Sequence, residues 1–178
     1  RAATWFTGQP FAATDGRSAQ SGWAVLRRAL GAASGRGEDE VRAISRRCND
    51  AGLAAREIMA GRPGSVAFSL AAGQALFDGL AGTRGPVGRQ ALLGEFFASC
   101  QALEASYVVR ILTGDLRIGL KEGLLEEAIA SAFGAEPEGV REAGMLLGDM
   151  GVLAVAAKRG ELEAAGLRVF HPVKCMLA

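Results

Sequence analysis

The amino-acid sequence predicts an all-α fold, a multi-helix bundle with pseudo-two-fold symmetry. Apolar residues recur three and four positions apart rather than two, which is the spacing of amphipathic helices. Turns rich in glycine and proline separate these segments. A helix, Gly-turn, helix pattern also recurs along the chain, which indicates repeated structural units. With 178 residues, 49% of them hydrophobic, the chain can bury the core of one globular domain or of two small ones.

Four helices are expected in the first part of the chain, over Ser18–Leu30, Glu38–Ala60, Ser65–Leu80 and Val87–Ala105. The first begins at Ser18, a residue type that caps helix N-termini well. The second has acidic residues in its first turn and is expected to be interrupted near Gly52. A Gly/Arg loop over residues 81–86 joins the third helix to the fourth. Arg1–Trp5 has the pattern of the middle of a helix with no Met before it, so we expect a fragment boundary there.

The second part of the chain is expected to hold helices over Tyr107–Thr113, Lys121–Phe133, Glu138–Leu147 and Val152–Arg159. The first of these continues the preceding helix and ends at Gly114. Pro137 stands where a first-turn proline is expected. The final stretch, Leu167–Ala178, alternates apolar and polar residues, which indicates extended backbone. We therefore divide the chain into a helical domain over residues 1–168 and an extended linker over residues 169–178.

The internal repeat consists of short helix-ending turns. Trp5-Phe6-Thr7-Gly8 matches Ile111-Leu112-Thr113-Gly114, and Leu146-Leu147-Gly148-Asp149 is a weaker third copy. Such units suggest a pseudo-symmetric domain that presents similar turns on one side. A simpler interpretation is that Thr-Gly is a common end of helices. Spacing alone leaves both interpretations open.

The charges are balanced overall but unevenly distributed. Twenty Lys and Arg against 19 Asp and Glu leave a formal net charge of +1. Residues 1–89 carry 12 basic and 7 acidic side chains, a net +5, whereas residues 90–178 carry 8 and 12, a net −4. One face of the protein can therefore be basic although the whole-chain charge indicates neither a nucleic-acid binder nor an acidic tail.

Cysteine, histidine and hydropathy exclude several classes of protein. The three thiols are far apart and odd in number, which argues against a disulfide framework and fits a reducing cytoplasm. His171 is the single histidine, so no zinc or di-iron site is expected. The most apolar stretch, Ala143–Ala157, is interrupted by Asp149 and falls short of the ~20 residues that span a bilayer. We therefore expect no metal and no membrane association.

No pattern of residues points to bond chemistry. The glycine-rich stretches Gly31–Gly37 and Gly79–Gly85 do not continue as Gly-Lys-Ser/Thr, so neither is a phosphate-binding P-loop. Pro172 lies between His171 and Cys175 and prevents the helical register that would bring thiol and imidazole together. No catalytic residue is therefore expected.

The segment Thr113–Glu122 has the outline of an anion site. A helix ends, two glycines flank Leu-Arg-Ile, and a new helix begins at Lys121. This places Arg117 and the free N–H groups of a helix N-terminus close together. The alternative is an ordinary connection between helices in which Arg117 only faces water.

The string ILTGDLRIGLKEGLLEEAIASAF around this turn resembles the signature segment of the N-terminal DNA-binding domain of ATP-dependent DNA ligases. The C-terminal FHPVKCMLA is similar to the Pro-(Ile/Leu/Val)-Lys-Pro-Met-Leu-Ala motif that precedes the adenylation domain in that family. The opening WFTGQPF and GWAVLRRAL resemble the first helical repeat of the bacterial branch. These matches follow the family order from start to end, so the resemblance covers essentially the whole chain.

The resemblance implies a domain that grips the minor-groove side of a nicked duplex without reading bases. By analogy, DNA contacts are expected at Gly114, Arg117, Gly119, Lys121, Arg17, Ser18 and Arg84. The implied partners are nicked double-stranded DNA and the adenylation and OB-fold domains of the same parent chain, which would seal the nick. The protein is expected to be a cytoplasmic, nucleoid-associated monomer.

The sequence departs from the family pattern in places. Asp115 occupies a position that is basic in some relatives, which would remove one phosphate contact, and Cys175 stands where the family usually has Pro. None of the three lysines, Lys121, Lys158 and Lys174, begins a Lys-x-Asp-Gly motif. The chain alone is therefore expected to be inactive and to hold no cofactor, with ATP and Mg²⁺ serving the parent enzyme.

The alternative function is a helical protein–protein interaction module without nucleic-acid binding. A basic stripe uniting Arg17, Arg84 and Arg117 would favour DNA, whereas a contiguous exposed apolar patch would favour a protein partner. A self-contained small enzyme is a third possibility, disfavoured because no acid–base or nucleophile constellation is present.

Overall fold

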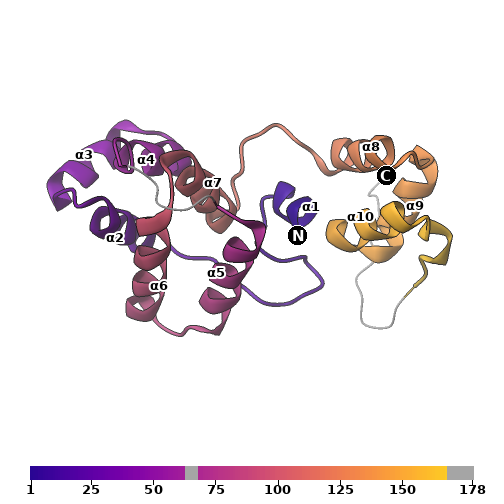
Figure 1. Ribbon diagram of the computed structural model, residues 1–178, viewed down its shortest axis with the longest axis horizontal. Coiled ribbons are helices and arrows are strands. Elements are labelled where there is room, and N and C mark those ends of the chain that lie inside the picture. The colour runs from indigo at the N-terminus through magenta and orange to yellow at the C-terminus, as the bar shows by residue number, and fades with distance from the viewer. Residues whose placement is uncertain (63–67, 168–178) are drawn as a thin grey trace. The chain divides into compact units, whose positions relative to one another are not determined.

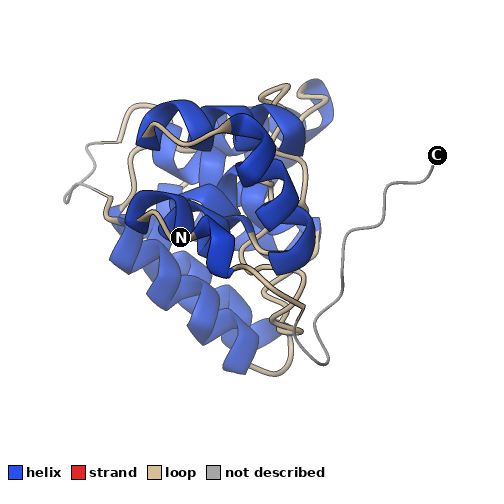
Figure 2. Cartoon of the chain, turned by 90° about the vertical axis from the view of Figure 1, so that its right-hand side faces the viewer, coloured by secondary structure: helices blue, strands red, loops and turns tan. Residues whose placement is uncertain are grey.

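A computed structural model describes residues 1–62 and 68–167, and it is built from helices (Figures 1 and 2). No strand occurs within those two ranges, so the all-α prediction is confirmed. The chain divides into two compact units, one formed by Arg1–Arg17 with the chain from Arg117 onward, and the other by Ser18–Leu116. We call them the split unit and the central unit. The predicted start of a helix at Ser65 and the predicted linker at 169–178 lie outside the described residues.

The central unit contains α2 (Trp23–Ser34), α3 (Glu38–Arg47), α4 (Ala51–Ile58), α5 (Leu70–Gly82), α6 (Pro86–Ser99) and α7 (Ala102–Thr113). Its main packing pairs are α4 with α7 and α2 with α6. Leu26 and Leu30 of α2 and Leu93 and Phe97 of α6 are fully buried. Since burying one such side chain contributes about 1.5–3 kcal/mol, these two apolar faces hold α2 and α6 together.

The joint between α4 and α7 depends on a glycine and a buried ion pair. Arg110 of α7 lies against Gly52 of α4, and a Cβ added at Gly52 would stand 2.6 Å from Arg110 Cγ and 2.8 Å from Cδ. The Arg110 guanidinium contacts Asp50 Oδ1 at 3.2 Å, with the two side chains only 15% and 6% exposed. Asp50 Oδ1 also accepts the Leu53 N–H at 2.6 Å, which caps α4. Gly52 is thus a site of close packing, and the predicted interruption falls before it, between α3 and α4.

Ser18 does not begin a helix, contrary to the sequence prediction, because α2 begins at Trp23 after the N-cap Gly22. The Ser18 hydroxyl accepts the Gln20 N–H at 3.3 Å, and the Ser21 hydroxyl donates to the Ala19 carbonyl at 3.3 Å. Small hydroxyl side chains compete in this way with helix formation. Residues 18–22 therefore form a connection instead of a first helical turn.

The long helix predicted from Val87 through Thr113 is also wrong, because it breaks at Cys100 and Gln101. Gln101 and Glu104 form a capping box, in which the Gln101 N–H donates to Glu104 Oε2 at 2.8 Å. The other oxygen of Glu104 accepts the Phe68 N–H at 3.0 Å. The break lets α7 take a direction of its own and pack against α4.

The split unit contains α1 (Ala2–Phe6), α8 (Glu122–Phe133), α9 (Pro137–Leu147), α10 (Met150–Arg159) and a 3₁₀ turn at Leu162–Ala164. Its core is made by apolar side chains of α8, α9 and α10, among them Leu125, Ile129, Val140 and Leu153. α1 packs on α10, and the indole N–H of Trp5 donates to the Pro10 carbonyl at 3.3 Å. No described helix is long and apolar enough to cross a bilayer.

The three repeated turns share one backbone feature. Gly8, Gly114 and Gly148 have φ values of +78°, +73° and +61°, a left-handed conformation that glycine adopts without strain. Gly114 and Gly148 are the C-caps of α7 and α9, whereas Gly8 follows Thr7, the C-cap of α1. The local geometry of the repeat is therefore present, and the pseudo-two-fold relation stays a prediction.

We predict that Gly52→Ala destabilises the domain by about 1–3 kcal/mol, since the new methyl group displaces the inner carbons of Arg110 and disturbs its contact with Asp50. Urea unfolding followed by circular dichroism measures this loss. Gly94→Ala in α6 is the matched control, because nothing lies within 4 Å of a Cβ added there. That control should be neutral or stabilising by up to ~1 kcal/mol. Equal effects of the two variants would contradict the packing role of Gly52.

Candidate nucleic-acid interface

The turn between α7 and α8 has an unusual backbone. Gly114 ends α7 with φ +73°, and the Asp115 N–H donates to the Arg110 carbonyl at 3.0 Å, as expected for a Schellman-type helix end. Gly119 follows with φ +68°, in open space with nothing within 4 Å of an added Cβ. Glycine is therefore required at Gly119 by backbone conformation, and within this chain it does not relieve crowding.

Arg117 is the one residue other than glycine, among those described, with a positive φ, at +51°. A side chain in this region costs on the order of 1 kcal/mol, because Cβ approaches the following carbonyl oxygen. The Arg117 side chain is exposed. The structure thus holds an exposed cation in a strained conformation at the position that the sequence singled out.

Arg110 anchors the beginning of this turn, a role that was not predicted from the sequence. Its Nη1 group donates to the Leu116 carbonyl at 3.3 Å while Nη2 contacts Asp50. The signal in the sequence was a lone cation within the apolar run of α7, with Val109 on one side and Ile111 on the other. Arg110 is therefore a positioning residue for the turn.

Lys121 is the N-cap of α8, as the sequence predicts within one residue, and its side chain is exposed. No side chain caps this helix end, so the first N–H groups of α8 are open to another acceptor. Glu122 stands in the first turn, where its negative charge interacts favourably with the helix dipole. The same charge would repel an anion bound at this helix end.

Arg17 belongs to the split unit and is already paired. Its guanidinium contacts Asp15 through Nε at 2.5 Å and through Nη2 at 2.8 Å, and it stacks 4.2 Å from the centre of the Phe11 ring. Hydrogen bonds from Arg17 lower the pKa of the Asp15 carboxyl. The Arg17 side chain is 48% exposed, so it can reach a phosphate only as part of this neutralising pair.

Ser18 and Arg84 belong to the central unit, where another arginine joins their two loops. Arg89 of α6 donates to the Gln20 carbonyl at 2.5 Å and to the Thr83 carbonyl at 3.0 Å. These bonds tie the connection that contains Ser18 to the loop that contains Arg84. Both side chains are exposed. The structure therefore brings Ser18 and Arg84 into one region, held by a residue that the sequence analysis did not select.

A hollow of about 270 Å³ in the split unit brings two of the repeated turns together. It is lined by residues of the first turn, including Thr7 and Gln9, by Glu122 at the start of α8, and by Gly148 and Asp149 of the turn between α9 and α10. Asp149 Oδ1 accepts the Gly151 N–H at 2.7 Å and so caps α10. Helix ends that are far apart in the sequence thus meet at one surface of this unit.

Both cysteines of the described ranges, Cys48 and Cys100, have raised thiol pKa values. Burial raises the pKa of the Cys100 thiol to about 12. Burial, followed by the contact with Glu57, raises the pKa of the Cys48 thiol as well. Both thiols are therefore poor nucleophiles near neutral pH. No group of three metal-ligating side chains occurs within residues 1–62 and 68–167.

Comparison with known proteins defines the family. The family model described as "DNA ligase N terminus" matches residues 2–130. A probable DNA ligase of Koribacter versatilis is 39% identical over 175 residues, which are 98% of this chain and 30% of that protein. A probable DNA ligase of Opitutus terrae is 38% identical over 211 residues, covering 99% of this chain and 21% of that protein.

A DNA ligase of Methanospirillum hungatei is 33% identical over 180 residues, which are 96% of this chain and 33% of that protein. This chain thus spans about a fifth to a third of the length of these relatives. The all-helical fold agrees with these matches. The chain belongs to the DNA ligase N-terminal domain family.

We predict that Arg89→Met loosens the two loops that it joins, since the variant keeps the apolar stem but loses the donors to Gln20 and Thr83. Backbone amides of residues 18–22 and 83–85 should exchange faster with deuterium, while those of α4 and α7 should not change. Arg84→Met removes an equal charge from an exposed side chain and should leave exchange as in the wild type. Identical exchange in both variants would show that Arg89 joins nothing.

Proposed function

We propose that this chain is the DNA-binding part of an ATP-dependent DNA ligase and that it grips nicked duplex DNA through the sugar-phosphate backbone and the minor groove. The observation that carries the proposal is Arg117, an exposed cation in a left-handed conformation between the glycines Gly114 and Gly119, shortly before the start of α8 at Glu122. Strain of this kind is retained where a site requires it. A phosphate at this turn would meet the guanidinium and the open N–H groups of α8.

In this proposal the other contacts come from the exposed side chains of Lys121, Ser18 and Arg84, with Arg17 a weaker ligand because Asp15 neutralises it. Base edges are ignored, since a ligase has to seal nicks in any sequence. The domain supplies affinity and orientation. Bond chemistry, with ATP and Mg²⁺, belongs to adenylation and OB-fold domains of a longer chain, and this part acts as a monomer in the cytoplasm at the nucleoid.

The proposal is tested by titrating two unrelated nicked duplexes and a single strand at several salt concentrations. Both duplexes should bind with the same modest affinity, and log K should fall linearly with log salt concentration, because bound phosphates release counterions. A marked sequence preference, or binding that salt does not weaken, would refute backbone recognition.

With labelled ATP and Mg²⁺ the chain should remain unlabelled, because no lysine lies in Lys-x-Asp-Gly.

Arg117→Ala should weaken binding to every duplex alike and reduce the salt slope by about one unit, while the free energy of unfolding changes by less than ~0.5 kcal/mol. Arg117→Gly is the sharper companion, since it removes the same charge and also relieves the left-handed strain. It should lose the same DNA affinity yet unfold at equal or higher urea. If either variant binds nicked duplex as the wild type does, the site is not at Arg117.

Gly119→Val should lose binding by a different route, because valine strains the φ of +68° and obstructs the approach of the backbone to the DNA. Since no charge is removed, the salt slope should change little. A fall in slope equal to that of Arg117→Ala would assign the loss to charge and refute the backbone role of Gly119.

A protein–protein interaction module is the second candidate function, favoured by one hollow of the split unit. This hollow, of about 350 Å³, is lined mainly by apolar side chains, and Phe6, Phe133 and Val155 at its edge are 40–50% exposed. If the wild-type domain fails to bind duplex DNA even at low salt, this alternative replaces the DNA-binding proposal.

A further inference from the structure

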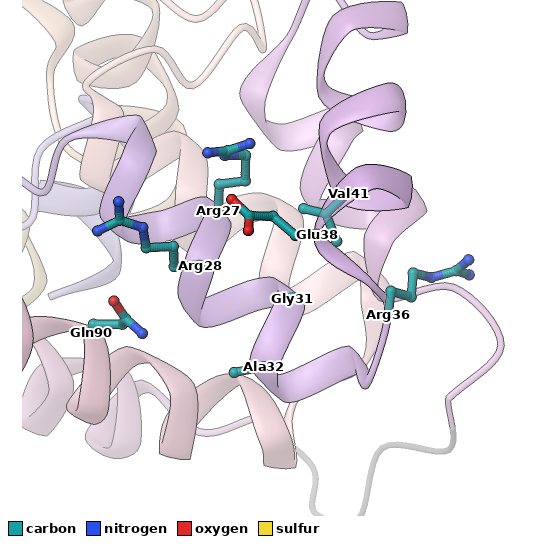
Figure 3. A pocket seen from close by; sticks show the side chains of 8 residues that line it. All are labelled: Arg27, Arg28, Gly31, Ala32, Arg36, Glu38, Val41 and Gln90. Carbon is teal, nitrogen blue, oxygen red and sulfur yellow. The ribbon is translucent and has the colours of Figure 1, made fainter.

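A basic hollow lies in the central unit, between α2, α3 and α6 (Figure 3). Its volume is about 240 Å³, and its lining includes Arg27, Arg28 and Gly31 of α2 and Gln90 of α6. Figure 3 shows both arginines extending from α2, with Gln90 below them on the neighbouring helix. None of these residues was selected from the sequence.

Arg27 and Arg28 have no partner within the described part of the chain. By contrast, Arg42, Arg47, Arg89 and Arg110 all bind carboxylates or carbonyl oxygens. Arg27 is half-buried, so its charge loses part of its hydration without gaining a counter-charge. A half-buried guanidinium without a partner is suited to an external anion.

Arg36 also lines the hollow, but its guanidinium is already bound elsewhere. It donates to the Ile58 carbonyl at 2.8 Å and to the Ala60 carbonyl at 3.2 Å, and it pairs with Glu40. Figure 3 shows its side chain extending away from Arg27 and Arg28. The cationic character of the hollow therefore comes from Arg27 and Arg28, and the Gln90 amide adds a neutral donor.

Glu38 is the one acidic residue that lines the hollow. Its carboxylate contacts Arg42 at 2.6 Å, four residues along α3, so its charge is compensated within that helix. Small residues, Gly31 and Ala32, leave space between Glu38 and the side of α6. The hollow thus has two free cations, a neutral donor and room for a group the size of a phosphate.

We propose that this hollow binds a backbone phosphate of the same DNA duplex that the domain is proposed to grip, so the inference rests on the proposed function. α2 and α6 begin directly after the loops that contain Ser18 and Arg84. Arg27 and Gln90 each stand five residues beyond the N-cap, about 8 Å along their helices. A duplex that touches those loops carries a charge every ~1.7 Å along its axis, which puts phosphates within reach.

The test compares duplex binding by the double variant Arg27→Gln, Arg28→Gln with binding by a control double variant, Arg46→Gln, Arg56→Gln. The control removes the same charge from exposed, unpartnered arginines of α3 and α4 that do not line the hollow. The first variant should lose about tenfold or more in affinity, and its salt slope should fall by about two units. The control should lose less than about threefold. Equal losses would overturn the proposal.

Removing a negative charge from the hollow, instead of the two positive charges, tests the same proposal independently. Glu38→Gln removes the acidic group from the hollow and should raise duplex affinity about two- to fivefold. Glu40→Gln is the matched control, because it lies in the same turn of α3 and pairs with Arg36 but does not line the hollow. Equal gains from the two variants would contradict a phosphate between Arg27 and Arg28.

A third measurement separates this inference from the proposed function. Inorganic phosphate is titrated into the wild-type domain while the Nε–H signals of the arginine side chains are followed by NMR. Signals of Arg27 and Arg28 should shift together, and those of Arg46 and Arg56 should not. If the domain binds no duplex, the proposed function fails. If phosphate still shifts the signals of Arg27 and Arg28 in that case, the hollow binds a free anion, and the proposal that it binds a DNA phosphate is overturned. If duplex binds but phosphate does not shift the signals of Arg27 and Arg28, phosphate binding in the hollow is refuted and the proposed function is not.

Discussion

The buried ion pair between Arg110 and Asp50 is the constraint on which the central unit depends. Two charges with side chains 15% and 6% exposed are stable only while they face each other, because either one left alone would cost several kcal/mol. Gly52 provides the space for the arginine, and Asp50 caps α4 with the same carboxylate. One contact thus fixes the start of α4, its packing on α7 and, through the Leu116 carbonyl, the exit of the chain from α7.

That exit leads into the turn where the strain is concentrated. Gly114, Arg117 and Gly119 adopt left-handed conformations within six residues, and α8 begins at once afterwards. Arg117 bears a conformational cost that glycine would avoid. Arg110 holds the Leu116 carbonyl on one side of the turn, and α8 on the other side packs in the core of the split unit.

The arginines of this chain differ in role according to whether their guanidinium groups have a partner within the described residues. Arg36, Arg89 and Arg110 donate to backbone carbonyls or a buried carboxylate and join segments of the fold. Arg27, Arg28 and Arg84 have no such partners in the described ranges; Arg27 and Arg28 lie on α2, and Arg84 lies in the loop before α6. A net charge of +1 therefore conceals a group of cations that no carboxylate of the described residues neutralises.

The sequence by itself determined the helical class, the family and most helix ends, because caps, prolines and glycines act within a single turn of chain. It predicted the end of α7 at Gly114 and the start of α8 near Lys121, but it misplaced the start of α2 at Ser18, where hydroxyl groups bind their own backbone. Only the tertiary structure decided which cations are structural. Arg89 and Arg110 find their partners 69 and 60 residues away, and no local pattern encodes contacts made by packing over such separations.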